Sequence, residues 1–196
     1  MSILFDYYFR AYDAFMKMFK LDNNQAILQR VETLNRPLNI ADIGGGTGLL
    51  ADTLIRLGHQ VTIIDPSKNM TNIAKQRNSQ VIIINEAFEK SSLKHSYDLI
   101  IMRDCLHHLP DHPAVLAKVF RWLKEGGMVI IQEFSPRSLS ARLLFFLERC
   151  SLEKIYPVYE EEIARLMAQA GFKSELVKIN RRDYLMIGVK GREGRS

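Results

Sequence analysis

The sequence predicts a doubly wound α/β domain built around a mostly parallel sheet. Short apolar runs alternate with helix-like segments from residue 38 onward, and glycine or proline separates many of them. Four of the first five runs are apolar throughout, as expected for strands that helices cover on both faces. The length of 196 residues, 47% of them hydrophobic, suits one domain with a substantial core.

The first 36 residues are expected to form an N-terminal helical cap, followed by the α/β domain over residues 37–196. Apolar side chains recur at steps of three and four residues, which predicts a helix over residues 5–34. Arg36 precedes Pro37, and a residue before proline is driven out of the α region, so the helix is expected to end there. The apolar stripe consists of Phe5, Phe9, Tyr12, Met16 and Phe19.

Five parallel strands and three helices are expected next along the chain. Gly58 is predicted to terminate the first of these helices, and Gly126 with Gly127 the third. The expected strands cover residues 38–43, 60–65, 81–85, 97–102 and 128–134, and the expected helices cover residues 49–57, 67–76 and 113–123.

The last part of the chain has a different order of elements. An amphipathic helix over residues 159–169, capped by Gly171, is followed by strand runs over residues 172–179 and 183–189. The short turn between these runs makes them an antiparallel hairpin. We therefore expect a seven-stranded sheet of five parallel strands plus a C-terminal antiparallel hairpin, with helices on both faces.

The segment over residues 139–150, LSARLLFFLERC, is apolar and basic at helical spacing. Three interpretations stay open for it. It could roof an apolar acceptor pocket, pack as ordinary core, or touch a membrane surface.

The strongest functional motif is Asp42-Ile43-Gly44-Gly45-Gly46-Thr47-Gly48, between the first strand and its helix. Glycine allows positive φ and leaves no Cβ to keep a ligand away from the backbone. The helix N-terminus just beyond presents free N–H groups. The spacing D-x-G-x-G-x-G differs from the dinucleotide fingerprint, because Leu49 stands where that pattern needs glycine, and no P-loop is present.

In this context the motif resembles that of class I S-adenosylmethionine-dependent methyltransferases, whose domain is Rossmann-like. The resemblance implies that S-adenosylmethionine is the cofactor and S-adenosylhomocysteine the product. It also implies that the loop wraps the methionyl part of the cofactor, whose amino group meets Asp42. The loop residues implied in binding are Gly44, Gly46, Thr47 and Gly48.

The ends of the second and third strands supply further cofactor candidates. Asp65 ends the second strand, where a carboxylate can accept hydrogen bonds from both ribose hydroxyls. An Asp that caps the turn before Pro66 is the alternative. The resemblance adds Pro66 and Met70 as walls of the adenosine pocket. It also implies that Glu86, beside Ala87, recognises the adenine amino group, with an ordinary surface glutamate as the alternative.

The fourth strand leads into Arg103-Asp104-Cys105-Leu106-His107-His108-Leu109, which resembles the strand-four ending of small-molecule methyltransferases. Ligands bind at such strand ends in open α/β sheets. Arg103 is expected to contact the cofactor. Either histidine, or Glu133 at the end of the fifth strand, could take a proton from the acceptor. A packed structural histidine is the alternative for His107 and for His108.

Two segments resemble a narrower branch, the ubiquinone/menaquinone-biosynthesis methyltransferases. They are Glu133-Phe134-Ser135-Pro136 and Tyr12-Asp13. The chain departs from that branch at His107-His108, where those enzymes carry Arg-Asn. The resemblance implies methyl transfer to a small-molecule acceptor, with a hydrophobic quinol- or phenol-like compound as the candidate.

Other function classes were weighed against this one. The net charge of +5 would suit a nucleic-acid methyltransferase, but the strand-four ending has neither an Asn-Pro-Pro-Tyr-like nor a Pro-Cys motif, so nucleic acid is not expected as a partner. A non-catalytic S-adenosylmethionine-binding partner protein is the other alternative. Two cysteines and no signal-like N-terminus predict a cytoplasmic protein. No metal site is expected, because Cys105 and His107 lack further ligands.

Overall fold

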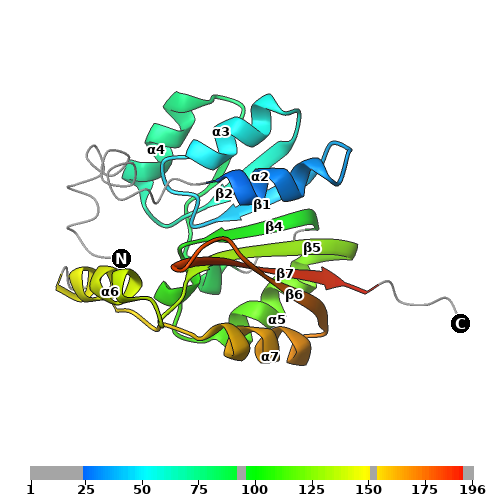
Figure 1. Cartoon of the computed structure of the whole chain (residues 1–196). Coiled ribbons are helices and arrows are strands. Elements are labelled where there is room, and N and C mark those ends of the chain that lie inside the picture. Colours follow the sequence, from blue (N-terminus) through cyan, green and yellow to red (C-terminus); the bar gives the residue numbers. More distant parts are fainter. Residues whose placement is uncertain (1–23, 92–95, 151–153, 192–196) are drawn as a thin grey trace, which may run out of the picture.

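The computed structural model describes residues 24–91, 96–150 and 154–191, and it confirms the predicted fold class (Figure 1). The seven strands form one sheet in the order β3-β2-β1-β4-β5-β7-β6. The first five pair in parallel, whereas β7 pairs antiparallel with both β5 and β6. The strands are β1 (Asn39–Ile43), β2 (Gln60–Ile64), β3 (Ile82–Ile84), β4 (Tyr97–Arg103), β5 (Leu123–Phe134), β6 (Phe172–Lys178) and β7 (Asp183–Lys190).

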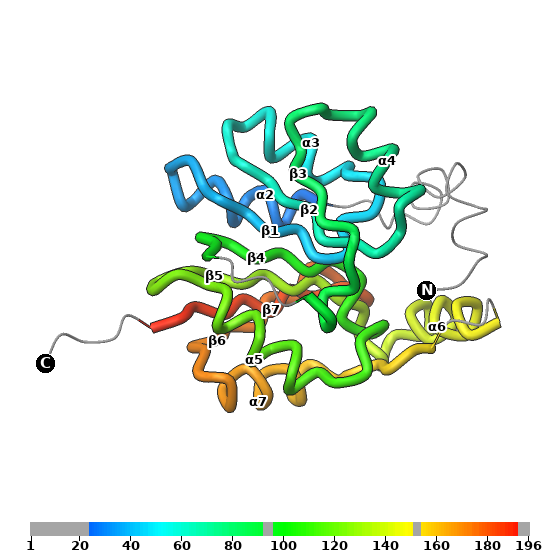
Figure 2. Tube along the Cα trace, turned by 180° about the vertical axis from the view of Figure 1, so that it is seen from behind, coloured from blue at the N-terminus to red at the C-terminus, as the bar shows by residue number. Residues whose placement is uncertain are grey.

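Helices cover both faces of this sheet (Figures 1 and 2). Helices α2, α3 and α4 lie on one face, and α5 and α7 lie on the other, while α6 stands beyond the end of the sheet. The described helices are α2 (Gln25–Glu32), α3 (Leu49–Arg56), α4 (Lys68–Arg77), α5 (His112–Trp122), α6 (Leu139–Cys150) and α7 (Glu160–Gln169), with short 3₁₀ turns η1 (Phe88–Lys90) and η2 (Leu106–His108).

The sheet separates two hydrophobic layers, which explains why the strand runs are apolar throughout. In β4, Leu99 and Ile101 belong to the layer under α2, α3 and α4, while Ile100 and Met102 belong to the layer under α5 and α7. Successive side chains of a strand point to opposite faces. A strand buried on both faces therefore consists mainly of apolar residues between its two ends.

The predicted helix over residues 5–34 is described only from Asn24 onward. Its aromatic stripe, and Tyr12-Asp13, lie outside the described residues. The predicted end at residue 34 was two residues late, because α2 ends at Glu32 and Asn35 adopts a left-handed φ of 45° in the turn that follows. Ile27 and Val31 of α2 are buried against the sheet. Within the described residues this helix is thus part of the α/β packing.

The fifth strand begins earlier than predicted. Helix α5 ends at Trp122, and Leu123 already pairs with Tyr97 of β4. The register then shifts, so that Met128 pairs with Leu99. The glycines expected to end the helix lie in this irregular stretch, where Gly126 has a φ of 73°. Glycine here serves a β-bulge, which sequence spacing does not distinguish from a helix stop.

The terminal elements agree with expectation. Gly171, with a φ of 99°, ends the turn after α7, and β6 and β7 form the predicted antiparallel hairpin. The segment over residues 139–150 is helix α6. Among the described helices, none has the length and apolar character needed to cross a membrane.

Candidate cofactor and acceptor site

The glycine loop lies at the carboxyl ends of the strands, between β1 and α3. Gly44, Gly46 and Gly48 have φ values of 71°, 53° and 74°. A Cβ at Gly44 would lie 2.8 Å from Cβ of Cys105, and one at Gly48 would lie 2.7 Å from Cβ of Ala74. These two glycines are therefore required by internal packing. At Gly46 the nearest atom would be Sδ of Met70, at 3.5 Å, so that position has room that the described side chains do not fill.

Asp42 is the predicted ligand of the cofactor's amino group, and it is buried beneath this loop. Its Oδ2 atom has no hydrogen-bond partner among the described residues. Burial raises the pKa of Asp42 to about 7, Arg103 opposes that effect, and Asp65 adds to it. A buried carboxylate without a donor is unfavourable, and an ammonium group of a ligand would satisfy it.

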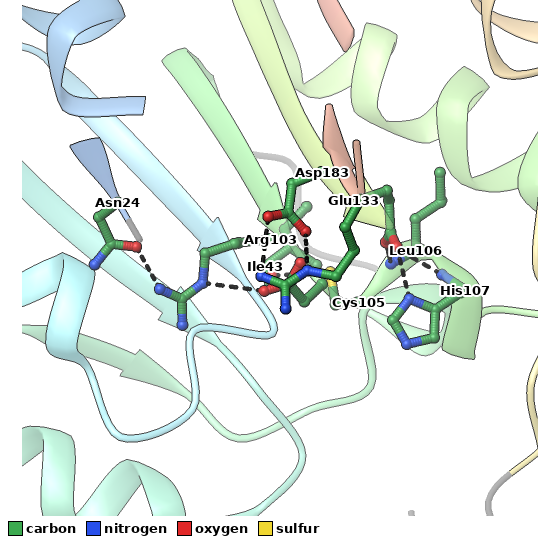
Figure 3. Close-up of polar contacts among 10 residues, drawn as sticks. Asn24, Ile43, Arg103, Cys105, Leu106, His107, Glu133 and Asp183 are labelled. Atoms are coloured by element: carbon green, nitrogen blue, oxygen red, sulfur yellow. Dashed lines mark hydrogen bonds and ion pairs between the residues drawn. The ribbon is translucent and has the colours of Figure 1, made fainter. Parts of the chain in front are cut away.

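Arg103 reaches from the end of β4 toward Asn24, which accepts a hydrogen bond from its Nη1 atom (Figure 3). Its Nε atom lies 3.8 Å from Oδ2 of Asp104. The guanidinium of Arg103 and the carboxylate of Asp42 lie close enough to interact electrostatically. Such a pair of opposite charges would complement the carboxylate and the ammonium group of a bound amino acid.

Asp65 links the glycine loop to the start of α4. Its Oδ2 atom accepts from the backbone N–H of Gly46 at 3.1 Å, and its Oδ1 atom accepts from that of Ser67 at 2.8 Å. The turn-stabilising role that the sequence left open is thus present. A carboxylate oxygen has more than one lone pair, so these contacts leave acceptor capacity for a ligand.

The remaining adenosine candidates lie close to this turn. Met70 is buried in the first turn of α4, where Ser67 caps the helix by accepting from its N–H group. Asn85 was missed by the sequence analysis. Its Nδ2 atom donates to Oγ1 of Thr71 at 2.6 Å and to the carbonyl of Asp65 at 3.3 Å, which fixes the end of β3 to α4. The adjoining Glu86 is exposed.

His107 and Glu133 form a buried pair between η2 and β5 (Figure 3). Nδ1 of the imidazole lies 2.6 Å from Oε2 of the carboxylate, and Oε1 accepts from the backbone N–H groups of Leu106, at 2.6 Å, and His107, at 3.3 Å. Glu133 is 2% exposed. Its carboxylate is therefore committed to orienting His107 and η2, and the prediction that it could meet an acceptor directly is not favoured.

The charge states of His107 and Glu133 depend strongly on each other. Burial alone would lower the pKa of His107, but the carboxylates of Glu133 and Glu148 reverse that effect and raise it to about 10. Burial alone would raise the pKa of Glu133, and the imidazolium of His107 instead brings it below its usual value. Both groups are therefore charged at neutral pH.

An apolar cluster packs against the imidazole. The ring of His107 lies 5.3 Å from that of Phe145 and 6.1 Å from that of Phe134, between ring centroids, and His108 lies 4.2 Å away. Phe134 and Phe145 belong to a hydrophobic cluster of β5 and α6. One face of α6 thus packs as core, and its other face exposes Leu139, Leu143, Phe146 and Leu147.

Asp104 is a second residue that the sequence analysis missed. It has a positive φ of 50°, which is rare for a residue with a side chain. Burial raises its pKa to about 7, with Arg103 lowering it and Glu133 raising it. Neither of its carboxylate oxygens has a hydrogen-bond partner among the described residues. A strained, buried, unsatisfied carboxyl group is typical of a functional position.

Comparison with known proteins agrees with this geometry. A family model described as a methyltransferase domain matches residues 12–177. An uncharacterised methyltransferase from Alkaliphilus oremlandii is 26% identical over 96% of both chains. The demethylmenaquinone methyltransferase of Tropheryma whipplei is 31% identical, over 69% of this chain and 66% of its own. The ubiquinone biosynthesis O-methyltransferase of Klebsiella pneumoniae is 26% identical, over 76% and 64% respectively.

Relatives with other acceptors also match. Phosphoethanolamine N-methyltransferase 1 of Arabidopsis thaliana is 28% identical over 76% of this chain, which spans only 30% of that relative. Among solved structures, a possible histamine N-methyltransferase from Thermotoga maritima has the same fold. Its TM-score is 0.75 at 22% identity, over 97% of this chain and all of the other. The chain therefore belongs to the methyltransferase domain family.

Proposed function

We propose that this enzyme methylates a small hydroxylated aromatic compound with an apolar body, of the quinol or phenol type. The observation that carries the proposal is the junction of polar and aromatic groups at the ends of β4 and β5. There, the His107–Glu133 pair lies against the cluster that contains Phe134 and Phe145. Such a junction suits a flat apolar ring that bears a polar oxygen.

The cofactor would be held by complementary charges and by the glycine loop. Asp42 would accept from the ammonium group of S-adenosylmethionine, and Arg103 would bind its carboxylate. Asp65 would accept from the ribose hydroxyls. The bare backbone around Gly46 would make room for the methionyl chain. The further contacts in this proposal are Gly44, Thr47 and Gly48 in the loop, Pro66 and Met70 beside the adenosine, and Glu86 with Ala87 at the adenine.

S-adenosylmethionine supplies an already activated methyl group, so the protein mainly has to align the acceptor. Correct orientation alone lowers the barrier by about 7–11 kcal/mol. In this proposal His107 or His108 would hydrogen-bond the acceptor oxygen. Glu133 is a positioning residue, because its carboxylate already accepts from His107 and from η2. We assign proton removal to Asp104, whose unsatisfied carboxyl group lies at the same edge.

A transfer assay with methyl-labelled S-adenosylmethionine tests the acceptor class. The panel contains a short-chain demethylmenaquinol, catechol, phosphoethanolamine, RNA and duplex DNA. Label in the quinol or the catechol, absent with a Gly46→Val control, supports the proposal. Label only in phosphoethanolamine or nucleic acid, or in no acceptor while the cofactor still binds, contradicts it.

A pair of variants on α6 tests whether this helix forms one wall of the acceptor pocket. Phe145 is buried against His107, whereas Leu143 is 59% exposed on the opposite face of the same helix. We expect Phe145→Ala to raise the KM of the acceptor by about tenfold and leave cofactor binding unchanged, because removal of a buried ring costs apolar contact. Leu143→Ala should change neither value. Equal effects of the two substitutions would argue against an acceptor site on this side of α6.

A further inference from the structure

Three potential metal-binding side chains converge where η2 meets α6. His107, His108 and Glu148 each offer a donor atom, and these atoms all lie within 4.8 Å of one another. Nε2 of His107 is 3.7 Å from Oε2 of Glu148, too far for a hydrogen bond. His107 is 1% exposed, and neither its Nε2 atom nor Oε2 of Glu148 has a hydrogen-bond partner among the described residues. Two buried polar atoms thus lie 3.7 Å from each other without a hydrogen-bond partner among the described residues.

The other side of His107 has the support that a metal ligand needs. Its Nδ1–H donates to Glu133 at 2.6 Å, which fixes the ring and directs Nε2 toward Glu148 and His108. An ion bound there would displace the proton that Nε2 carries in the charged imidazole. Metal-ligating histidines almost always donate their second ring N–H to a carboxylate or a carbonyl in this way. Glu133 in turn is held by the backbone N–H of Leu106. His107, the Glu133 carboxylate that orients its ring, and the backbone N–H that holds Glu133 are therefore all present.

We propose that His107, His108 and Glu148 bind one divalent transition-metal ion, with Zn²⁺ as the reference ion. Two imidazoles and one carboxylate are a recurrent ligand set for zinc with an open fourth position, and imidazole favours such ions over Mg²⁺. Ligands about 2.0–2.1 Å from a tetrahedral ion lie about 3.3 Å from one another. The observed spacings are wider, 3.7 Å between His107 and Glu148 and up to 4.8 Å within the set, so ion binding would require the side chains to move closer together.

The position of the site would allow a bound ion to contact the methyl acceptor. An ion at this point would lie beside the aromatic cluster of Phe134 and Phe145, with its open position available to an oxygen. A metal ion lowers the pKa of a hydroxyl group bound to it. Binding of the ion itself depends only on the three side chains and not on the identity of the acceptor.

Metal titration of the full-length, tag-free protein tests the proposal. After treatment with a chelator, the protein is titrated with Co²⁺, followed by its visible ligand-field bands, and with Zn²⁺, followed by calorimetry. We expect one ion per chain. Glu148→Gln should weaken binding by at least about tenfold, the lower end of the loss seen when even an outer-shell partner is removed. The matched control is Glu162→Gln, an exposed glutamate of α7, which should bind like the wild type.

The outcomes are distinct. Stoichiometric binding that Glu148→Gln loses and Glu162→Gln keeps supports the site. No Co²⁺ bands, or equal binding by both variants, overturns it. Circular dichroism establishes that Glu148→Gln remains folded, and His108→Gln serves as a second variant if it does not. Calorimetry with S-adenosylmethionine on the same samples separates this inference from the proposed function, because either can fail without the other.

Discussion

At the residue scale, the candidate site is marked by carboxyl groups that the fold buries without satisfying. Asp42 and Asp104 are both at strand ends, and burial raises the pKa of each to about 7. Oδ2 of Asp42 and both carboxylate oxygens of Asp104 lack hydrogen-bond partners among the described residues. In the folded protein these two carboxyl groups therefore hold a proton more readily than a carboxyl group in water does. A ligand group that binds the ionised carboxylate must overcome this preference.

The pH dependence of cofactor binding should follow Asp42. A ligand ammonium binds the ionised carboxylate, so binding releases the proton that Asp42 holds below pH 7. The affinity for S-adenosylmethionine should rise by about tenfold per pH unit from pH 5.5 to 7 and then level off. Calorimetry over this range measures it. Asp42→Asn, of the same shape, should bind weakly without this slope, and an unchanged slope in the variant would exclude Asp42 as its source.

Sequence alone identified Asp42 but not Asp104, for a physical reason. Asp42 stands in a glycine motif whose spacing is informative by itself. Asp104 was identified by its φ of 50° and by the burial of both its carboxylate oxygens, and neither property is encoded in a local pattern. Asp65 was identified from the sequence, with its turn-capping contact to Ser67 as one of two alternatives. Its contact to Gly46 was not predicted, since it depends on how the loop and the end of β2 meet.

At the scale of elements, the site depends on how β4 and β5 end side by side. The parallel pairing brings Arg103 opposite Gln132, so the turn η2 begins next to Glu133. The strands were predictable from their apolar runs. The 3₁₀ turn, the bulge before Met128 and the approach of Glu148 to His107 were not, because each arises from contacts distant in sequence.

Glu133 should stabilise this junction. Its removal leaves His107 in the core without the carboxylate that stabilises its charge, and it leaves the N–H of Leu106 without its Glu133 acceptor. Glu133→Ala should therefore lower the free energy of unfolding by about 3–5 kcal/mol, measured by urea denaturation. Glu125→Ala is the control on the same strand. Its ion pair with Lys190 is partly exposed and should contribute less than about 1 kcal/mol. Similar losses in both variants would contradict the assigned role.

At the scale of the molecule, one rigid sheet with two buried layers presents all the candidate residues at its carboxyl edge. The order of elements, the parallel pairing and the terminal hairpin were all predicted correctly, because hydrophobic burial on two faces leaves a strong signal. The C-terminal ends of the described helices agree with the predicted ones within one or two residues. The start of β5 does not, because Leu123 already pairs with β4 ahead of the irregular stretch that contains Gly126 and Gly127.

Ligand binding at this edge should stabilise the whole domain. S-adenosylhomocysteine at about 100 times its Kd should add about 2.7 kcal/mol, which for a domain of this size raises Tm by about 5–11 °C. Differential scanning fluorimetry measures this shift, with NAD at the same concentration as the control. A shift with NAD and none with S-adenosylhomocysteine would be incompatible with the assigned cofactor.

The most direct test of the central claim is calorimetric titration of S-adenosylmethionine into the wild type, Gly46→Val and Gly58→Val. Both glycines have positive φ, 53° at Gly46 and 90° at Gly58, so valine is strained at both positions and Gly58→Val controls for that strain. A Cβ at Gly58 would contact nothing, whereas one at Gly46 would enter the space assigned to the ligand. We predict one bound cofactor per chain for the wild type and Gly58→Val, and none for Gly46→Val. Wild-type affinity in Gly46→Val would contradict the proposed site.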